Sequence, residues 1–309
     1  METQKAVFSF MDALIAITHE WQIPTMMFLF VMGLVFRVII YYTVKREEWF
    51  AKEFEKRVDI YLKERDLKGI VSFYIVCKKM LEKTFYDLFK VRFIMKRRKP
   101  DFVMTYADRI FLIKQGSAIL VEDFLKHLKH LRYNEANHPR LLSTTKKIFS
   151  KNPCFSNIFG IIPASTVNDI INILPGIFIV SGVFGTFMGI MESLPLLGNM
   201  DIGDVEASKL VMDQFLVNIA FSMNSSLIGI GLSVFLSLFN ASLSPEKLFV
   251  SAVERMESAL DTVWHLSANN DVPSNLIDFD EHRSPEEVLA QQAVNEELIL
   301  AAKHRKEAS

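Results

Sequence analysis

Glycines and hydroxyl side chains interrupt two otherwise apolar stretches of this sequence. SGVFGTFMGI, residues 181–190, holds three glycines and one threonine, and FLVNIAFSMNSSLIGIGLSVFLSLF, residues 215–239, holds five serines. A neutral hydroxyl donates a hydrogen bond to a charged carboxylate, accepts one from a protonated carboxyl, and binds water without imposing a fixed charge. Neither stretch contains Asp, Glu, Lys, Arg or His, although a proton relay across a bilayer normally needs an ionisable group. If these hydroxyls line an ion path, the titrating residue must come from another chain.

The second stretch has one small, polar face when it is drawn as a helix at about 100° per residue. The polar arc is about 120° wide on this wheel, and it contains Asn218, Ser222, Ser225, Ser226, Gly229, Ser233 and Ser237. Leu236 is the one bulky residue within the arc. The opposite face carries Met223, Leu227, Val234 and Leu238. These faces predict a helix with a polar side and a lipid-type side.

The first stretch has a glycine groove with a hydroxyl at its edge. Gly182, Gly185 and Gly189 fall on one side of the wheel, and Thr186 lies beside them. The 185–189 pair has the GxxxG spacing that lets two helix backbones approach closely. We predict a helix-packing role for these three glycines and for Gly229 of the second stretch. The hydroxyls leave two interpretations open: they line an ion path, or they only pack and bond back to their own helix.

The composition indicates that these stretches are membrane helices. Half of the 309 residues are hydrophobic, and they are concentrated in three segments, which is typical of an integral membrane protein. Segments 23–43, 169–194 and 211–240 are each long enough to cross ~30 Å of hydrocarbon as a helix. We predict an all-α fold with three transmembrane helices. Arg37, the only charge in the first segment, is expected to snorkel to the interface.

The charges of the connecting segments predict the orientation. Residues 45–151 hold 26 Lys or Arg against 14 Asp or Glu, whereas residues 192–213 hold one Lys against five acidic residues. Because positive loops stay inside, we place the N-terminus in the periplasm and the C-terminus in the cytoplasm. The remaining segments are then a periplasmic interfacial helix (1–22), a cytoplasmic helical domain extended from the spans (44–168), a periplasmic loop (195–210), a cytoplasmic helix (241–268) and a cytoplasmic tail (269–309).

Two span motifs resemble a known family. LPGIFIVSGVFGTFMGI is similar to the second long span of the MotA/TolQ/ExbB proton-channel family, whose pattern is close to LGLLGTxxGI. AFSMNSSLIGIGLSVFLSLFN resembles that family's last span, and the resemblance covers about residues 165–265. Three spans with an outer N-terminus match TolQ and ExbB. The GTFxGI form and the serine-rich last span are most similar to the ZorA-type motor subunits of the Zorya anti-phage system.

The resemblance implies an assembly and a mechanism in the bacterial inner membrane. It implies a homopentameric ring around a dimer of a single-span MotB/TolR/ExbD-like partner, which carries a membrane-embedded Asp and a periplasmic domain. Ion passage to that Asp drives rotation and so couples the ion-motive force to mechanical work. Thr186 matches the family's first channel-lining Thr. The second lining hydroxyl matches Ser225 if the TSxxG form applies, or Ser226 if the shorter TxxG form applies, and Ser222 and Asn218 share their arc.

The rest of the sequence does not favour catalysis. No nucleophile, phosphate-loop or paired-carboxylate signature is present, so we expect no enzyme activity and no cofactor, with H⁺ or Na⁺ as the translocated ion. His127 and His130 lack partners at metal-ligand spacing, and the basic run at 96–99 is expected to be a solvated face without nucleic acid. Three functions stay open: a rotary-motor ion channel, a ZorA-type anti-phage defence motor, and a membrane scaffold that moves no ions.

Overall fold

The chain forms two compact units, each assembled from distant parts of the sequence. The computed structural model describes residues 2–64, 72–89, 106–131, 139–158, 161–198, 205–272 and 284–292. Unit 1 combines residues 1–39 with 165–244, and unit 2 combines residues 40–164 with 245–309. Within the described residues the fold is all-α apart from two strands of two residues each. The predicted basic run at 96–99 and residues 199–204 of the predicted periplasmic loop lie outside the described residues.

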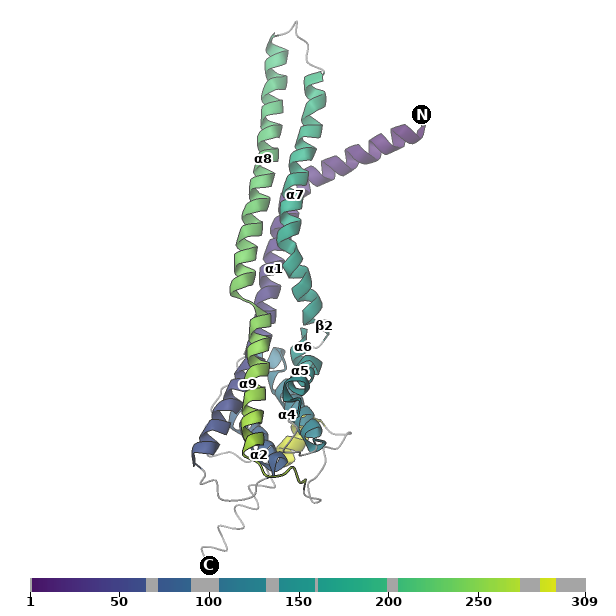
Figure 1. The fold of residues 1–309 in the computed structure, drawn as a ribbon. Coiled ribbons are helices and arrows are strands. Elements are labelled where there is room, and N and C mark those ends of the chain that lie inside the picture. The colour runs from purple at the N-terminus through teal and green to yellow at the C-terminus, as the bar shows by residue number, and fades with distance from the viewer. Residues whose placement is uncertain are drawn as a thin grey trace, which may run out of the picture. The chain divides into compact units, whose positions relative to one another are not determined.

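Unit 1 contains three helices that are long and apolar enough to cross a membrane. They are the first part of α1 (Glu2–Glu64), α7 (Ala164–Gly198) and α8 (Val205–Ser242). In an apolar solvent a helix satisfies its backbone N–H and C=O groups within the segment, so continuous apolar stretches of this length form helices. α7 and α8 run side by side (Figure 1). The predicted all-α fold with three helices that could span a membrane is therefore confirmed, and the pentameric ring stays a prediction.

α1 is continuous from Glu2 and contains Pro24 within it. The predicted interfacial segment 1–22 and the predicted first span are therefore parts of one helix.

The three helices of unit 1 share a small apolar core. Met26 of α1, Leu174 and Phe178 of α7, and Leu236 of α8 are buried together. Leu236 is the bulky residue that interrupts the predicted polar arc, and it is completely buried. Leu174 fills the space beside Gly33 of α1, which has no side chain, and Leu236 Cδ2 lies 3.8 Å from the potential Cβ of the same glycine. The interruption of the arc is thus the place where apolar packing holds the three helices together.

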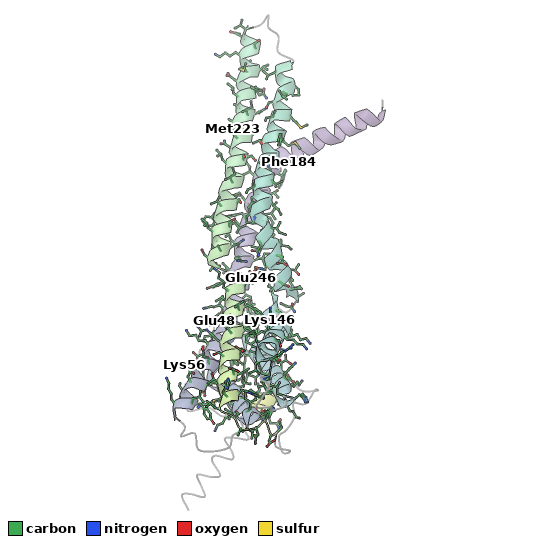
Figure 2. The ribbon with its side chains drawn as sticks, viewed as in Figure 1. Glu48, Lys56, Lys146, Phe184, Met223 and Glu246 are labelled. Atoms are coloured by element: carbon green, nitrogen blue, oxygen red, sulfur yellow. The ribbon has the colours of Figure 1, made fainter. Side chains whose placement is uncertain are left out.

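The outer faces of α7 and α8 are apolar and exposed. Met223 and Leu227 of α8 are 60% and 66% exposed, and Phe187 of α7 is 63% exposed. Phe184 and Met223 project from the outside of the two helices (Figure 2). The predicted lipid-type face of α8 is therefore confirmed as an exposed apolar face.

Unit 2 is a bundle of shorter helices packed with the second part of α1. These helices are α2 (Phe73–Leu88), α3 (Tyr106–Ile110), α4 (Ile113–Lys129), α5 (Leu141–Lys151), α6 (Pro153–Ser156) and α9 (Pro245–His265). Strands β1 (Asn157–Ile158) and β2 (Ile162–Pro163) pair antiparallel between α6 and α7. α9 begins at Pro245, whose fixed φ and missing N–H suit the first turn of a helix. The predicted segments 44–168 and 241–268 therefore contribute to one unit.

Buried polar contacts orient the helices of unit 2. Asp108 of α3 is completely buried, and its carboxylate accepts a hydrogen bond from the Tyr42 hydroxyl at 2.6 Å and pairs with Arg46 Nε at 3.0 Å. A buried carboxylate is tolerated only when it is paired in this way. Aromatic rings fill much of the remaining core, such as Phe73 and Trp264, whose centroids lie 4.9 Å apart.

Candidate functional site

α7 and α8 touch backbone to backbone at two glycines. A Cβ atom on Gly229 would lie 2.5 Å from the Phe178 carbonyl oxygen and 3.0 Å from Gly182 Cα. A Cβ atom on Gly182 would lie 3.1 Å from Ser226 Cα. Because Cβ atoms are essentially never found under 3.0 Å from another atom, only glycine fits at position 229 at this helix separation.

Polar side chains, not a neighbouring backbone, lie closest to Gly185 and Gly189. The Ser225 hydroxyl and the Gln22 amide occupy the space above Gly185, and the Ser222 hydroxyl occupies the space above Gly189. The predicted glycine groove is therefore a pair of notches that hold polar groups from α8 and α1. The glycine spacing indicated the close approach but not its contents, because the wheel of one helix does not show the side chains of its neighbours.

Two of the predicted hydroxyls bond back to their own helix. Thr186 Oγ1 donates to the Val183 carbonyl oxygen at 2.6 Å, and Ser222 Oγ donates to the Asn218 carbonyl oxygen at 2.8 Å. This pattern is common for Ser and Thr in helices and by itself requires no function. Each hydroxyl oxygen keeps lone pairs that accept a further hydrogen bond. Back-bonding therefore leaves these groups able to contact water or a protonated acid.

The polar arc of α8 is divided between the inside and the outside of unit 1. Ser222 and Ser225 are 2% and 0% exposed, because they face the glycine notches of α7. Ser226 is half-buried and Ser237 is exposed, and Thr186 of α7 is half-buried as well. Of the two alternatives for the second lining hydroxyl, Ser226 is accessible from outside the chain and Ser225 is not. The role of these residues, and of the half-buried Asn218, in an ion path stays a prediction.

Gln22 of α1 joins this site, although the sequence pattern did not single it out. Its side chain is 8% exposed, and Nε2 donates to the Ser181 carbonyl oxygen at 2.5 Å. Ser181 lies at the middle of α7 (Ala164–Gly198). The end of the predicted 1–22 segment therefore contacts α7 halfway along its length. A glutamine next to an apolar stretch gave no signal, because such residues are usually exposed.

Arg37 connects the three helices of unit 1 at a second polar contact. It is 3% exposed, and its guanidinium donates to Asn168 Oδ1 and to the Asn240 carbonyl oxygen, both at 2.6 Å. Asn240 Nδ2 donates in turn to the Ile171 carbonyl oxygen at 3.3 Å. Arg37 is therefore buried between the three helices, bonded to neutral acceptors near the start of α7 and the end of α8. Its place at the membrane interface stays a prediction.

An exposed amide, Asn224, lies on the outer face of α8. It is next to Met223, which is 60% exposed, and its side chain makes no hydrogen bond within the part of the chain that the structure describes. An amide without a hydrogen bond costs roughly 2–7 kcal/mol in an apolar environment. We therefore expect protein or water, not lipid, to cover this position. The wheel missed Asn224 because it falls outside the serine arc.

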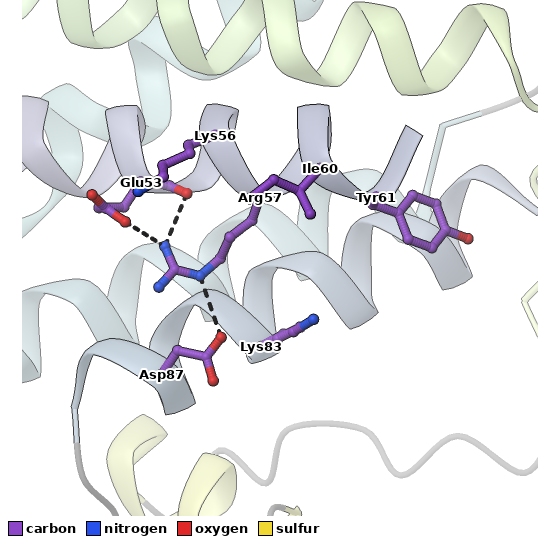
Figure 3. Close-up of a pocket in the computed structure, with 7 residues that line it drawn as sticks. All are labelled: Glu53, Lys56, Arg57, Ile60, Tyr61, Lys83 and Asp87. Carbon is purple, nitrogen blue, oxygen red and sulfur yellow. Dashed lines mark hydrogen bonds and ion pairs between the residues drawn. The ribbon is translucent and has the colours of Figure 1, made fainter. Parts of the chain in front are cut away.

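Unit 2 offers a charged pocket of about 220 Å³ between α1 and α2 (Figure 3). Arg57 in this pocket bonds to Glu53 Oε2 at 2.7 Å and to Asp87 Oδ2 at 3.4 Å. These pairs neutralise the guanidinium of Arg57, and Lys56 and Lys83 line the same pocket. His127 Nδ1 contacts the Asp123 carbonyl oxygen at 2.8 Å in its own helix, and the described residues contain no cluster suited to a metal ion.

No model of a known protein family matches the chain, and no curated protein matches it. The resemblance to the MotA/TolQ/ExbB family therefore rests on the two span motifs, residues 174–190 and 220–240.

Proposed function

We propose that the chain is the ion-channel subunit of a MotA/TolQ/ExbB-type rotary motor in the bacterial inner membrane. One observation carries this proposal: α7 and α8 pack through glycines while the hydroxyl residues Thr186 and Ser226 remain accessible beside the contact. Residues 170–191 and 214–240 contain no ionisable side chain. A conducting complex must therefore take its titrating group from elsewhere, and a single-span partner with a membrane Asp supplies one.

The hydroxyls suit the transfer step of such a channel. A hydroxyl beside the partner's carboxyl donates to it when it is charged and accepts from it when it is protonated. Because the hydroxyl is neutral, it lowers the barrier for either state without trapping the ion. One charge that crosses 100 mV releases about 2.3 kcal/mol, a step small enough for a shallow, reversible site. The ion is H⁺, with Na⁺ as the alternative that the same neutral oxygens would accept.

The outer surface of unit 1 supports assembly into a ring. The exposed Asn224 amide needs protein or water next to it, and the exposed apolar side chains of α7 and α8 need lipid or protein. We propose a homopentamer around two copies of the single-span partner, oriented with the N-terminus in the periplasm and the C-terminus in the cytoplasm. Transport, not catalysis, is the activity of this assembly.

A second candidate function is a motor of the ZorA type in phage defence. The observation that favours it is the GTFxGI form at residues 185–190 together with the serine-rich last span. A neighbouring gene for a single-span partner with a peptidoglycan-binding domain, together with defence nucleases, would support this candidate. The third candidate, a membrane scaffold, differs from both in that it moves no ions.

Proton flux through membrane vesicles of the host, which contain the chain with its native partners, tests the proposal. Thr186→Ala combined with Ser226→Ala is expected to remove most of the flux, whereas the exposed Ser237→Ala is the matched control on α8. Full flux in a double variant that is present at the wild-type level would refute a channel lined by these hydroxyls. Native mass spectrometry of the purified chain gives a separate test, because a monomer or an even-numbered ring contradicts the pentamer.

A further inference from the structure

One hydroxyl of unit 1 lacks the hydrogen bond that its neighbours make. Ser222, Thr186 and Ser193 each donate to a carbonyl oxygen of their own helix. Ser225 is 0% exposed, and its Oγ has no hydrogen-bond partner within the described residues. Buried hydroxyls without a partner are rare in folded proteins, because the group loses its contacts with water and gains nothing in return. The space around Ser225 Oγ is therefore a candidate site for a bound molecule.

A second polar side chain faces the same space. A Cβ atom on Gly185 would contact Ser225 Oγ and would lie 2.6 Å from Gln22 Nε2 and 2.7 Å from Gln22 Oε1. The hydroxyl of α8 and the amide of α1 thus converge on one spot beside α7. They make no direct hydrogen bond with each other. A single water bridges two such groups when they are near but not bonded.

The orientation of the Gln22 amide is determined by α7. Nε2 donates to the Ser181 carbonyl oxygen at 2.5 Å, and the opposite orientation would bring two oxygens together. This bond uses one N–H of the amide. The second N–H and the lone pairs of Oε1 remain available. The amide therefore presents both a donor and an acceptor toward the side of Ser225.

We propose that Gln22, Ser181 and Ser225 form a binding site for one water molecule, built by all three membrane helices beside Gly185. The water accepts a hydrogen bond from Ser225 Oγ and donates one to Gln22 Oε1, while Ser181 holds the amide in place. A metal cation fits less well, because a hard cation takes about six oxygen ligands, and these side chains offer two. The site stabilises the chain whether or not the assembly conducts ions, so it does not depend on the proposed function.

A double-mutant cycle on the purified full-length chain tests this site. Ser225→Ala, Gln22→Met and the double variant are compared with wild type by thermal unfolding in one detergent, with Ser237→Ala as the exposed control. Ser225→Ala is expected to lower the melting temperature by about 2–4 °C, and Gln22→Met by more, because it also loses the bond to Ser181. The double variant should lose less than the sum of the two, since both single changes release the same water.

Three results would overturn the proposal. A higher melting temperature for Ser225→Ala would mean that no water forms a hydrogen bond with the Ser225 hydroxyl in the folded chain. Additive losses would mean that Ser225 and Gln22 share no ligand. Stabilisation by NaCl or LiCl that disappears in Ser225→Ala would identify a cation in place of water. If a variant does not fold, an experimental density map of the wild-type chain decides: the expected peak lies between Gln22 and Ser225, and its absence in a map that shows other buried waters refutes the site.

Discussion

Replacing Gly229 by alanine is predicted to force α7 and α8 apart. The new methyl group would lie 2.5 Å from the Phe178 carbonyl oxygen and 3.0 Å from Gly182 Cα. Both atoms belong to the backbone, so no side-chain rotation relieves the contact. Overpacking of this kind costs about 1–3 kcal/mol, and the better helix propensity of alanine offsets up to about 1 kcal/mol. With the full offset we expect a net loss of about 0–2 kcal/mol, centred on about 1 kcal/mol, and a melting temperature lower by a few degrees.

Gly231→Ala is the matched control, because Gly231 lies on the same helix and has no atom within 4 Å of its potential Cβ. Gly176→Ala provides the same control on α7. Both should leave the melting temperature unchanged or raise it, since only the propensity term acts. The measurement is thermal unfolding of the purified full-length variants in one detergent. If Gly229→Ala is as stable as Gly231→Ala, α7 and α8 do not pack through Gly182 and Gly229.

Three further perturbations test other parts of the structure. Arg37→Lys should lower the melting temperature, because a single ammonium cannot reproduce the two bonds of the planar guanidinium to Asn168 and Asn240; an unchanged melting temperature would contradict that contact. Burial raises the pKa of the Cys77 thiol. In a Cys154→Ser background, iodoacetamide at pH 8 should therefore label Cys77 only after the chain unfolds. Rapid labelling of the folded chain would show that the thiol is exposed. Burial, followed by the neighbouring Glu122, raises the pKa of Asp123 above its ordinary value of 3.8. A raised carboxyl pKa means that stability is lost as the pH rises through the folded-state value. Asp123→Asn should therefore stabilise the chain at pH 7, with an advantage that disappears below about pH 3.8, and an advantage that persists there would exclude ionisation as its cause.

The helices of unit 1 could be predicted from the sequence because lipid leaves few alternatives. A long apolar segment must satisfy its own backbone, so length and composition predict a helix. The outward face of α8 was equally predictable, since large apolar residues such as Met223 and Leu227 recur at helical spacing. The same periodicity identified Leu236 as an exception, and the structure gives its reason as a member of the three-helix core.

The polar contacts between helices could not be predicted in the same way. A wheel gives the angle of a residue on its own helix but neither the neighbour nor the height at which two helices meet. Gln22 and Ser181 are 159 positions apart in the sequence, and Arg37 and Asn240 are 203 positions apart. The position of Arg37 near the end of a span predicts that it reaches the interface, but it does not identify Asn168 and Asn240 as its partners.

The division of the α8 polar arc separates two roles that the sequence left together. The part of the arc that includes Ser222 and Ser225 lies against α7 and is buried, so its substitution acts first on the stability of the chain. The part that includes Ser226 is accessible from outside, so its substitution acts on whatever lies next to the helix. This predicts a crossed pattern: Ser225→Ala lowers the melting temperature, whereas Ser226→Ala lowers ion flux at a nearly unchanged melting temperature. The opposite pattern would place Ser225 in the ion path and would require α8 to rotate about its axis when the chain meets its partners.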